Sequence, residues 1–420
     1  MRSSRQPTAR GPVQPGERAL APDLARGVML LLIVLSNTGF YLWAAEHGAS
    51  GWHPTDGSTV DQVVQFLMIT ALDLRTYPLF AFLFGYGMTQ LFLRQTAAGA
   101  APKAAVSLLR RRSLWLIVFG FAHAALLMAG DIIGAYGLAS LVLGWLFLRR
   151  ANRTLLVWAA IGVALIALFT VPSVIDATTG HFGHIDASTV EPTTVVYASG
   201  EENPLAAAGT RLQTWLFVVF VAGGVAVPIH VAILLGFWAA RRRVLEEPHR
   251  HLALLRWTAA VGVPIGWLGG LPAALAHVGA LDVPAAAVAE SGALAEIAAG
   301  TGLFGGLGYV ALFGLLAHRM SARARRSPAA IAVAAVGKRS LSSYLTHSLI
   351  FSPVLAAWGL GLGGKLGSAS MAAFAVGVWL VTVAGAYALE RAGRRGPAEA
   401  LLRWLVYRDI PAVKPAAPVG

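Results

Sequence analysis

The stretch Arg110–Tyr136 places two side chains capable of proton chemistry, His123 and Asp131, in an otherwise apolar run. A carboxylate beside an imidazole can fix the tautomer of the ring and stabilise its protonated form, as a general base requires. Ionisable groups at membrane depth are costly, so they are functional candidates. A buried histidine often serves instead as a hydrogen-bond partner between helices, and the sequence leaves both interpretations of His123 open.

The elements that must position these residues are predicted to be membrane helices. Hydrophobic residues make up 56% of the 420 residues and charged residues only 13%, with a mean hydropathy of +0.65. A soluble domain carries about 25% charged residues. Runs without charge recur at lengths that match a bilayer, so we expect an all-α, polytopic integral membrane helix bundle of about ten transmembrane helices.

The expected organisation is a single transmembrane domain over residues 23–408. Residues 1–22 are rich in Pro, Arg and Gly and are expected to form a disordered tail, and residues 409–420 a second one. The first helix is predicted to begin at Pro22–Asp23. Residues 284–300 are predicted to form an amphipathic or re-entrant helix. The chain has no cysteine, which excludes a thiolate nucleophile and thiolate-bound metals, and we expect no metal site.

Basic and acidic residues separate onto alternate connections between the predicted spans. The basic connections carry Arg94, Lys103, Arg110–Arg112, Arg149, Arg150, Arg153, Arg241–Arg243 and Arg323–Arg326. The opposite connections collect Glu46, Asp56, Asp61, Asp176, Asp186, Glu191, Glu201, Glu202 and Asp282. This positive-inside pattern predicts that both termini are cytoplasmic. Topology and lipid headgroups then explain most of the net charge of +13, so we expect a lipid bilayer and no nucleic acid as partner.

This orientation also predicts the depth of the candidate residues. His123 lies about seven residues before the Gly130 turn, so it is expected roughly 10 Å beneath the outer rim, with Asp131 at the rim. Asn37, late in the first helix, and His347 are expected in the outer half as well. These groups could share an outward-opening cavity. Asp73 and Arg75 interrupt another span and are expected to pair with each other.

Four separate stretches carry a family resemblance. They are Asp23-Leu-Ala-Arg-Gly with Asn37, Leu79-Phe-Ala-Phe-Leu-Phe-Gly-Tyr-Gly, Arg110–Tyr136 with Gly120, His123 and Asp131, and Gly337-Lys-Arg-Ser-Leu-Ser-Ser-Tyr-Leu-Thr-His-Ser. Together they resemble the bacterial YeiB-like family of membrane proteins, a domain of unknown function numbered 418. The resemblance covers nearly the whole chain beyond residue 22, and it implies a multi-pass protein of the plasma (inner) membrane.

That family is similar to a wider group of transmembrane acyltransferases. The group includes lysosomal heparan-alpha-glucosaminide N-acetyltransferase and the O-acyltransferases of bacterial surface polysaccharides. The similarity implies that acetyl-CoA or another acyl-CoA enters from the cytosol. It also implies that the acyl group passes to a hydroxyl or amine of a small-molecule or glycan acceptor outside. The bacterial O-acyltransferases place a histidine eleven positions after an arginine in the first helix, where this chain has Arg26 followed by Asn37, so that base is missing.

The lysosomal enzyme resembles the chain more closely, because it carries an asparagine in that helix and a catalytic histidine at the start of the next loop. His47 is the nearest match to this histidine, and His53 is a second possibility. Two alternative bases therefore stand, His47 from the resemblance and His123 from its position beside Asp131. Asn37 would orient the acyl carbonyl or support the developing oxyanion.

The donor is expected at the basic cytoplasmic face. Arg26 would contact the phosphates or the pantetheine arm, although it also suits a positive-inside anchor. The triplet Arg110, Arg111 and Arg112 would add further positive charge for the donor. A small-solute transporter is the rival class, since it too uses buried ionisable residues and interrupted helices. The sequence leaves the oligomeric state open, a homodimer included.

Overall fold

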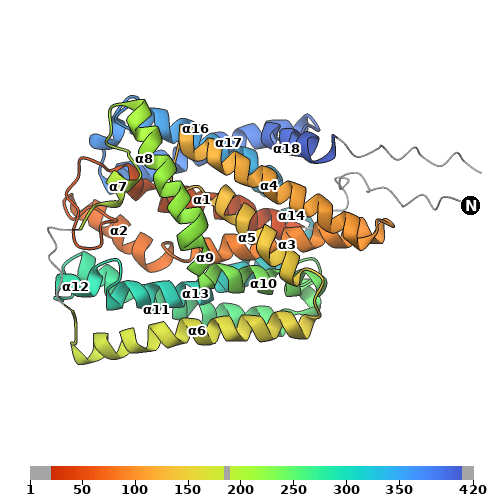
Figure 1. Cartoon of the computed structure of the whole chain (residues 1–420), viewed down its shortest axis with the longest axis horizontal. Helices are drawn as coiled ribbons and strands as arrows, with labels where there is room; N and C mark the ends of the chain where they lie inside the picture. The colour runs from red at the N-terminus through yellow and green to blue at the C-terminus, as the bar shows by residue number, and fades with distance from the viewer. Residues whose placement is uncertain (1–19, 184–189, 409–420) are drawn as a thin grey trace, which may run out of the picture.

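The computed structural model describes residues 20–183 and 190–408, and every regular element within them is a helix (Figure 1). The longer helices are α1 (Leu20–Ser36), α2 (Thr59–Ala71), α3 (Thr76–Ala97), α4 (Pro102–Leu126), α5 (Ile132–Phe147), α6 (Asn152–Thr179), α8 (Pro204–Phe217), α10 (Val227–Arg241), α11 (Leu252–His277), α13 (Ala293–Arg319), α15 (Pro328–Lys338), α16 (Ser340–Leu355), α17 (Ser368–Arg391) and α18 (Pro397–Tyr407). The short ones are η2 (Thr38–Tyr41), α7 (Thr193–Val196), the π-helical η4 (Val218–Ala222), α9 (Gly223–Val225), η5 (Pro248–Arg250), α12 (Ala285–Val288), α14 (Ala322–Arg325) and η6 (Leu362–Gly364).

The all-α, multi-pass prediction is confirmed. Within residues 20–183 and 190–408, six spans are long and apolar enough to cross a membrane: Leu20–Tyr41, Asn152–Thr179, Pro204–Val225, Leu252–His277, Ala285–Arg319 and Ser368–Arg391. The bent pair α2–α3 makes a seventh. The predicted total of about ten rests on shorter helices: α5, α10 and α15 are apolar but have fewer than 18 residues. The last 18 residues of α4 include Arg110–Arg112, so this helix is too charged for the same criterion.

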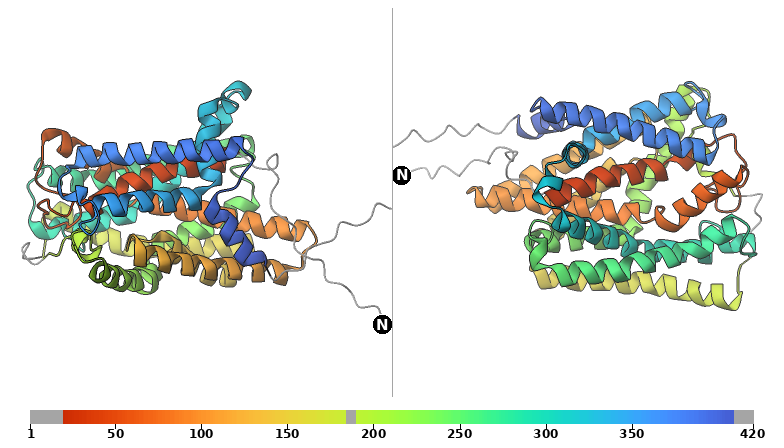
Figure 2. Two further views of the ribbon diagram at one scale, coloured as in Figure 1. Left: turned by 90° about the horizontal axis from the view of Figure 1, so that it is seen from above. Right: turned by 180° about the vertical axis from the view of Figure 1, so that it is seen from behind.

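Helix α1 lies inside the bundle. The right view of Figure 2 shows it in red between the blue α17 and the green-to-cyan pair α11 and α13, with the yellow α6 at the edge. Its span is 61% buried, whereas those of α6, α8 and α17 are each 22% buried. The peripheral helices therefore present most of their apolar surface outward, as lipid contact requires, and α1 is in a position to carry a site.

Two predicted boundaries are wrong. Helix α1 already includes Leu20, the first described residue, so it extends ahead of the predicted start at Pro22–Asp23. The stretch 284–300 is no separate re-entrant element: α12 leads through Gly292 into the long helix α13. Of the two predicted tails, residues 20–22 are helical, and residues 1–19 and 409–420 lie outside the described residues.

The predicted interruption at Asp73–Arg75 is confirmed as a 44° bend between α2 and α3. Leu74 there adopts a left-handed φ of 62°. Arg75 is fully buried and donates to the carbonyls of Gly266 (3.1 Å from Nε), Ile69 (3.3 Å from Nη1) and Asp73. The guanidinium thus satisfies carbonyls near the break. Its expected side-chain partner was Asp73, but that carboxylate instead bonds Ser36 and His53.

Glycines let the helices approach closely. A Cβ at Gly236 of α10 would overlap the Phe82 carbonyl of α3, and one at Gly85 of α3 would lie 3.0 Å from the Cα of Ile233 in α10. The two backbones are therefore nearly in contact, which is the small-residue packing typical of membrane helices.

We expect Gly236→Ala to separate α3 from α10 and to lower the free energy of unfolding by about 1–3 kcal/mol, the usual cost of overpacking. Gly377→Ala is the matched control, because nothing lies within 4 Å of a Cβ at that position of α17. Thermal unfolding of the detergent-solubilised protein, followed by tryptophan fluorescence, measures both. Equal melting temperatures for the two variants would contradict close α3–α10 packing.

Candidate functional site

The C-terminal end of α1 lies between two histidine–aspartate pairs. We call the six residues of this region the α1 C-terminal site: Ser36, Asn37, His53, Asp73, His123 and Asp131. All except Asn37 are buried. Ser36 and Asn37 are consecutive, yet each contacts a different part of the bundle. The site therefore joins the loop after α1, the α2–α3 break and the α4–α5 connection.

The first pair is His53 with Asp73. Nε2 of His53 donates to Oδ2 of Asp73 at 2.7 Å, and Oγ of Ser36 donates to Oδ1 at 2.8 Å. Both pair members are 4% exposed. Because a carboxylate only accepts, the neutral ring carries its proton on Nε2 and keeps a lone pair on Nδ1. This is the arrangement of a carboxylate-oriented general base.

The second pair is His123 with Asp131, which the sequence placed together. Nδ1 of His123 lies 3.0 Å from Oδ1 of Asp131, and both side chains are almost fully buried. The ring is turned so that neither nitrogen forms an aligned hydrogen bond. Asp131 instead caps α5: its oxygens accept from the amides of Ile133 (3.1 Å) and Gly134 (2.6 Å) and from Nε1 of Trp215 (3.2 Å). The carboxylate thus has a structural role in addition to its contact with His123.

Asn37 lines a small cavity with residues of α16. The cavity is bounded by Ile33, Val34, Asn37, Met128, Tyr344, His347, Ser348 and Phe351. It offers about 10 Å³ to the centre of a water-sized sphere, which is room for one water. Of the residues expected to share an outward-opening cavity, Asn37 and His347 line this small one, whereas His123 and Asp131 are not part of its lining. His123 lies one side chain away, with its ring centroid 5.2 Å from that of Tyr344.

His47 lies apart from both carboxylates in the loop after η2. Its Nδ1 donates to the carbonyl of Ala45 at 2.9 Å, and its Nε2 has no hydrogen-bond partner. Burial lowers the pKa of His47 below its ordinary value, so the ring is neutral at pH 7. Of the two histidines suggested by the resemblance, His53 is therefore the one that bonds a carboxylate, that of Asp73, and His47 is not.

A group of arginines, which we call the arginine cluster (Arg26, Arg94 and Arg112), lies at the other end of α1. Arg26 donates to the carbonyl of Leu83 at 3.0 Å and lies 3.5 Å from Asp23. The charge of Arg112 interacts with those of Arg26 and Arg94. Carboxylates lie near this cluster as well, because Asp23 pairs with Arg26 and the charge of Glu399 interacts with that of Arg112. Guanidinium groups also suit a phosphate-bearing ligand.

The predicted basic triplet divides among three environments. Arg112 belongs to the arginine cluster, whereas Nη2 of Arg111 donates to the Leu405 carbonyl of α18 at 3.4 Å. Arg110 is exposed. Arg94 was absent from the predicted donor residues, although the charge pattern placed it on the same basic connection as Arg110–Arg112.

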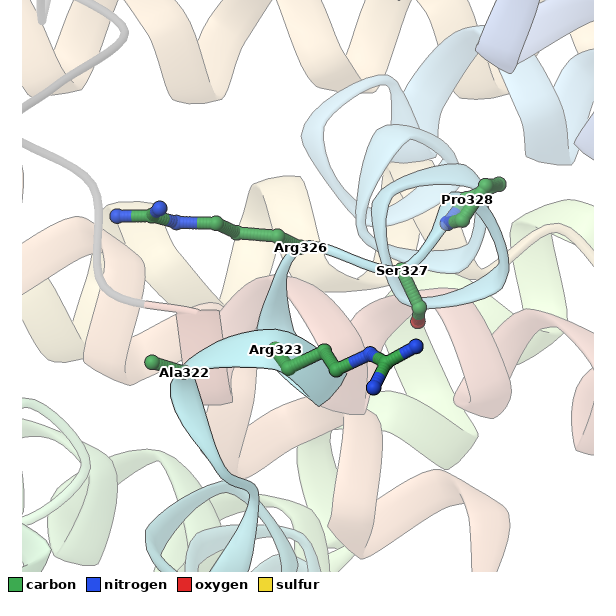
Figure 3. A pocket seen from close by; sticks show the side chains of 5 residues that line it. All are labelled: Ala322, Arg323, Arg326, Ser327 and Pro328. Carbon is green, nitrogen blue, oxygen red and sulfur yellow. The ribbon is translucent and has the colours of Figure 1, made fainter.

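A larger hollow lies away from these residues. It has about 540 Å³ and is bounded by Ala322, Arg323, Arg326, Ser327 and Pro328, where α14 leads into α15. Figure 3 shows that its two arginines extend in opposite directions, so they do not converge on a common ligand. Within residues 20–183 and 190–408, no three histidine or carboxylate side chains are grouped as a metal ion would require.

Apolar helices at bilayer length, an interrupted span and buried histidine–aspartate pairs define a polytopic α-helical membrane protein. The profile of the family described as "Protein of unknown function (DUF418)" matches residues 239–409. The uncharacterized protein YxaH of Bacillus subtilis (strain 168) is 27% identical over 424 residues, covering 96% of this chain and 97% of the relative. The uncharacterized protein YeiB of Escherichia coli (strain K12) is 28% identical over 418 residues, covering 93% and 97%. These matches support the YeiB-like DUF418 family that the motifs of the chain predicted.

We expect Asp73→Asn to destabilise the protein, because hydrogen bonds to a charged acceptor contribute about 1.5–3 kcal/mol each. Thermal unfolding in detergent measures the loss. Asp56→Asn in the adjacent loop is the control, since Asp56 is exposed. If both variants have the same melting temperature, the Ser36–Asp73–His53 network has no role in stability.

Proposed function

We propose that the chain is an integral membrane acyltransferase of the bacterial plasma membrane. It moves an acetyl or other short acyl group from cytosolic acyl-CoA to a hydroxyl or amine acceptor on the external side. One observation carries the proposal: α1 has the arginine cluster near its N-terminal end and two histidine–aspartate pairs at its C-terminal end. With both termini in the cytoplasm, the first faces the cytosol and the second lies in the outer half.

The arginine cluster supports binding of the donor. Guanidinium groups bind phosphate oxygens through paired, charge-assisted hydrogen bonds, and coenzyme A carries several phosphates. Arg26 and Asn37 are eleven residues apart on α1, which corresponds to about 16 Å along the helix. The acyl end of a donor held at Arg26 must therefore extend through the bundle to reach Asn37.

The α1 C-terminal site supports the transfer step. The acceptor must lose a proton, and a histidine whose protonated form is stabilised by a carboxylate suits this task. His53 has the aligned carboxylate contact, His123 has the close but misaligned one, and His47 has neither. The side-chain amide of Asn37 can donate to the oxyanion that forms at the thioester carbonyl.

The rival function is transport of a small solute. The observation in its favour is the α2–α3 break, where Asp73 and Arg75 lie at an interruption, because discontinuous helices often form ion and substrate sites in transporters. A transporter reconstituted into liposomes carries its substrate across their membrane and does not cleave acyl-CoA. Release of coenzyme A thiol therefore separates the two functions.

We expect the purified protein to bind acetyl-CoA and to release coenzyme A when bacterial membrane extract supplies acceptors. Because the chain has no cysteine, it does not itself react with a thiol-reactive dye, and extract without the protein gives the background to be subtracted. His53→Ala should lower the release by about 10²–10⁴-fold, the usual contribution of a general base. His123→Ala and His47→Ala rank the other two histidines, and the exposed His181→Ala is the control. Failure to bind any short acyl-CoA would eliminate the acyltransferase.

Replacing either Arg26 or Arg112 by alanine should weaken acetyl-CoA binding by about tenfold, equivalent to about 1.4 kcal/mol. The turnover rate at saturating donor should change much less, since the arginines are distant from the transfer step. Arg149→Ala removes an exposed charge from the α5–α6 connection and serves as the control. Isothermal titration gives the Kd values, and an unchanged Kd in both cluster variants would rule out this donor site.

A further inference from the structure

Several buried polar atoms without a hydrogen-bond partner belong to residues that line the cavity at Asn37 or pack beside it. Among the described residues, the buried polar atoms without a hydrogen-bond partner include the hydroxyl of Tyr344, Nδ1 of His347 and both ring nitrogens of His123. Tyr344 and His347 line the cavity, and His123 packs against Tyr344. Buried polar atoms are nearly always satisfied, so a group of them around one cavity indicates a ligand that supplies the missing partners.

The hydrogen bonds around His347 fix its tautomer. The hydroxyl of Thr382 donates to the carbonyl of Trp379 at 2.7 Å. Its oxygen therefore accepts from Nε2 of His347, which lies 3.1 Å away. A neutral imidazole has one N–H, so Nδ1 carries the lone pair. His347 thus presents a hydrogen-bond acceptor with no partner, and the residue is only 4% exposed.

Tyr344 presents the complementary donor. Its side chain is buried, at 4% exposure. The hydroxyl oxygen interacts with the backbone amide of Ile132, whereas the hydroxyl proton has no acceptor. The ring is fixed from behind by His123, which in turn contacts Asp131. The cavity wall also includes the amide of Asn37 and the hydroxyl of Ser348, both of which can donate or accept.

A hydroxyl group matches this set of partners. It donates one hydrogen bond, which His347 can accept, and it accepts up to two, which Tyr344 and Asn37 can donate. A protonated amine has three donors and no acceptor, so it would leave Tyr344 unsatisfied and would place a charge in a dry cavity. A neutral amine has a single lone pair, so it could accept from Tyr344 or from Asn37 but not from both, whereas a hydroxyl oxygen can accept from both. The volume also fits one oxygen-sized group.

We propose that this cavity binds the hydroxyl group of an alcohol acceptor, or a water molecule in its absence, between Nδ1 of His347 and the hydroxyl of Tyr344. The proposal rests on the acyltransferase function and narrows its acceptor from a hydroxyl or amine to an alcohol. Thr382 is a positioning residue, since it acts by keeping the proton of His347 on Nε2. Neither Tyr344 nor His347 was among the predicted catalytic residues.

Water and methanol are the probes, because each presents a hydroxyl small enough for the cavity. The purified protein is incubated with acetyl-CoA, thiol release is followed with a dye, and the products with methanol or methylamine are separated by mass spectrometry. Hydrolysis joins the water oxygen to the acyl carbon, breaks the carbon–sulfur bond and leaves acetate and coenzyme A thiol. With methanol the product is methyl acetate, and with methylamine it is N-methylacetamide. We expect hydrolysis, and methyl acetate in excess of N-methylacetamide.

Tyr344→Phe and His347→Gln should each reduce both hydroxyl reactions at least tenfold while the Kd for acetyl-CoA changes less than twofold. Thr382→Val should act like His347→Gln, and Thr382→Ser should restore the rate because it keeps the hydroxyl. A merely structural threonine would not show this restoration by serine. Ser370→Ala, in the first turn of the same helix α17 but outside the cavity lining, is the control.

The outcomes separate this inference from the function on which it rests. If the native protein binds acetyl-CoA but the Tyr344 and His347 variants react at the native rate, the hydroxyl subsite is wrong and the acyltransferase stands. The subsite is equally wrong if the native protein binds acetyl-CoA without hydrolysing it, or forms N-methylacetamide in excess. If the native protein binds no acyl-CoA, the proposed function is wrong and the subsite with it.

Discussion

The buried guanidinium of Arg75 holds together the region on which the site depends. It binds carbonyls of α2 and α11 at a point where the α2–α3 span is interrupted. Water cannot satisfy such groups inside a bilayer, so the interruption is stable only because a side chain satisfies them. The bend then leaves the carboxylate of Asp73 free to bond Ser36 and His53. The hydrogen bond between this carboxylate and Ser36 of α1 therefore depends on the bend at residues 72–75.

The same constraint organises α1. Its C-terminal end contacts two carboxylate-bearing connections, because Ser36 bonds Asp73 at the α2–α3 break and the amide of Asn37 contacts Met128 in the α4–α5 connection. Its N-terminal half packs against α15, where Gly27 and Gly337 leave no space for a side chain. The most buried span of the bundle is therefore also the one that links the two ends at which polar groups gather. A central helix can serve both ends because peripheral helices separate it from the lipid.

Much of the fold and part of the site follow from the sequence. Apolar runs identify the helices, and the short separation of His123 from Asp131 predicts their contact, since a tight turn must bring them together. Depth counted along the helices predicts Asn37 and His347 in the same half of the bundle, and tertiary packing brings both to one cavity. The Ser36–Asp73–His53 network joins residues 20 and 37 positions apart, so it depends on tertiary packing that no local pattern reveals. Arg75 and Asp73 show a further limit of prediction from the sequence. Their closeness in the chain suggested an ion pair, but at the bend each side chain bonds other partners. Tyr344 lies within a recognisable motif, but only the structure shows that its hydroxyl lacks an acceptor.

The hydrogen bond from Trp215 to Asp131 has a mechanical consequence. Trp215 belongs to α8, whose span is 22% buried and which continues into the π-helical turn η4. A helix with so little protein around it adjusts its tilt to the thickness of the surrounding bilayer. Any such tilt moves one of the donors that hold the carboxylate beside His123. The lipid composition of the membrane thereby becomes part of the electrostatic environment of a buried histidine that the lipid never touches.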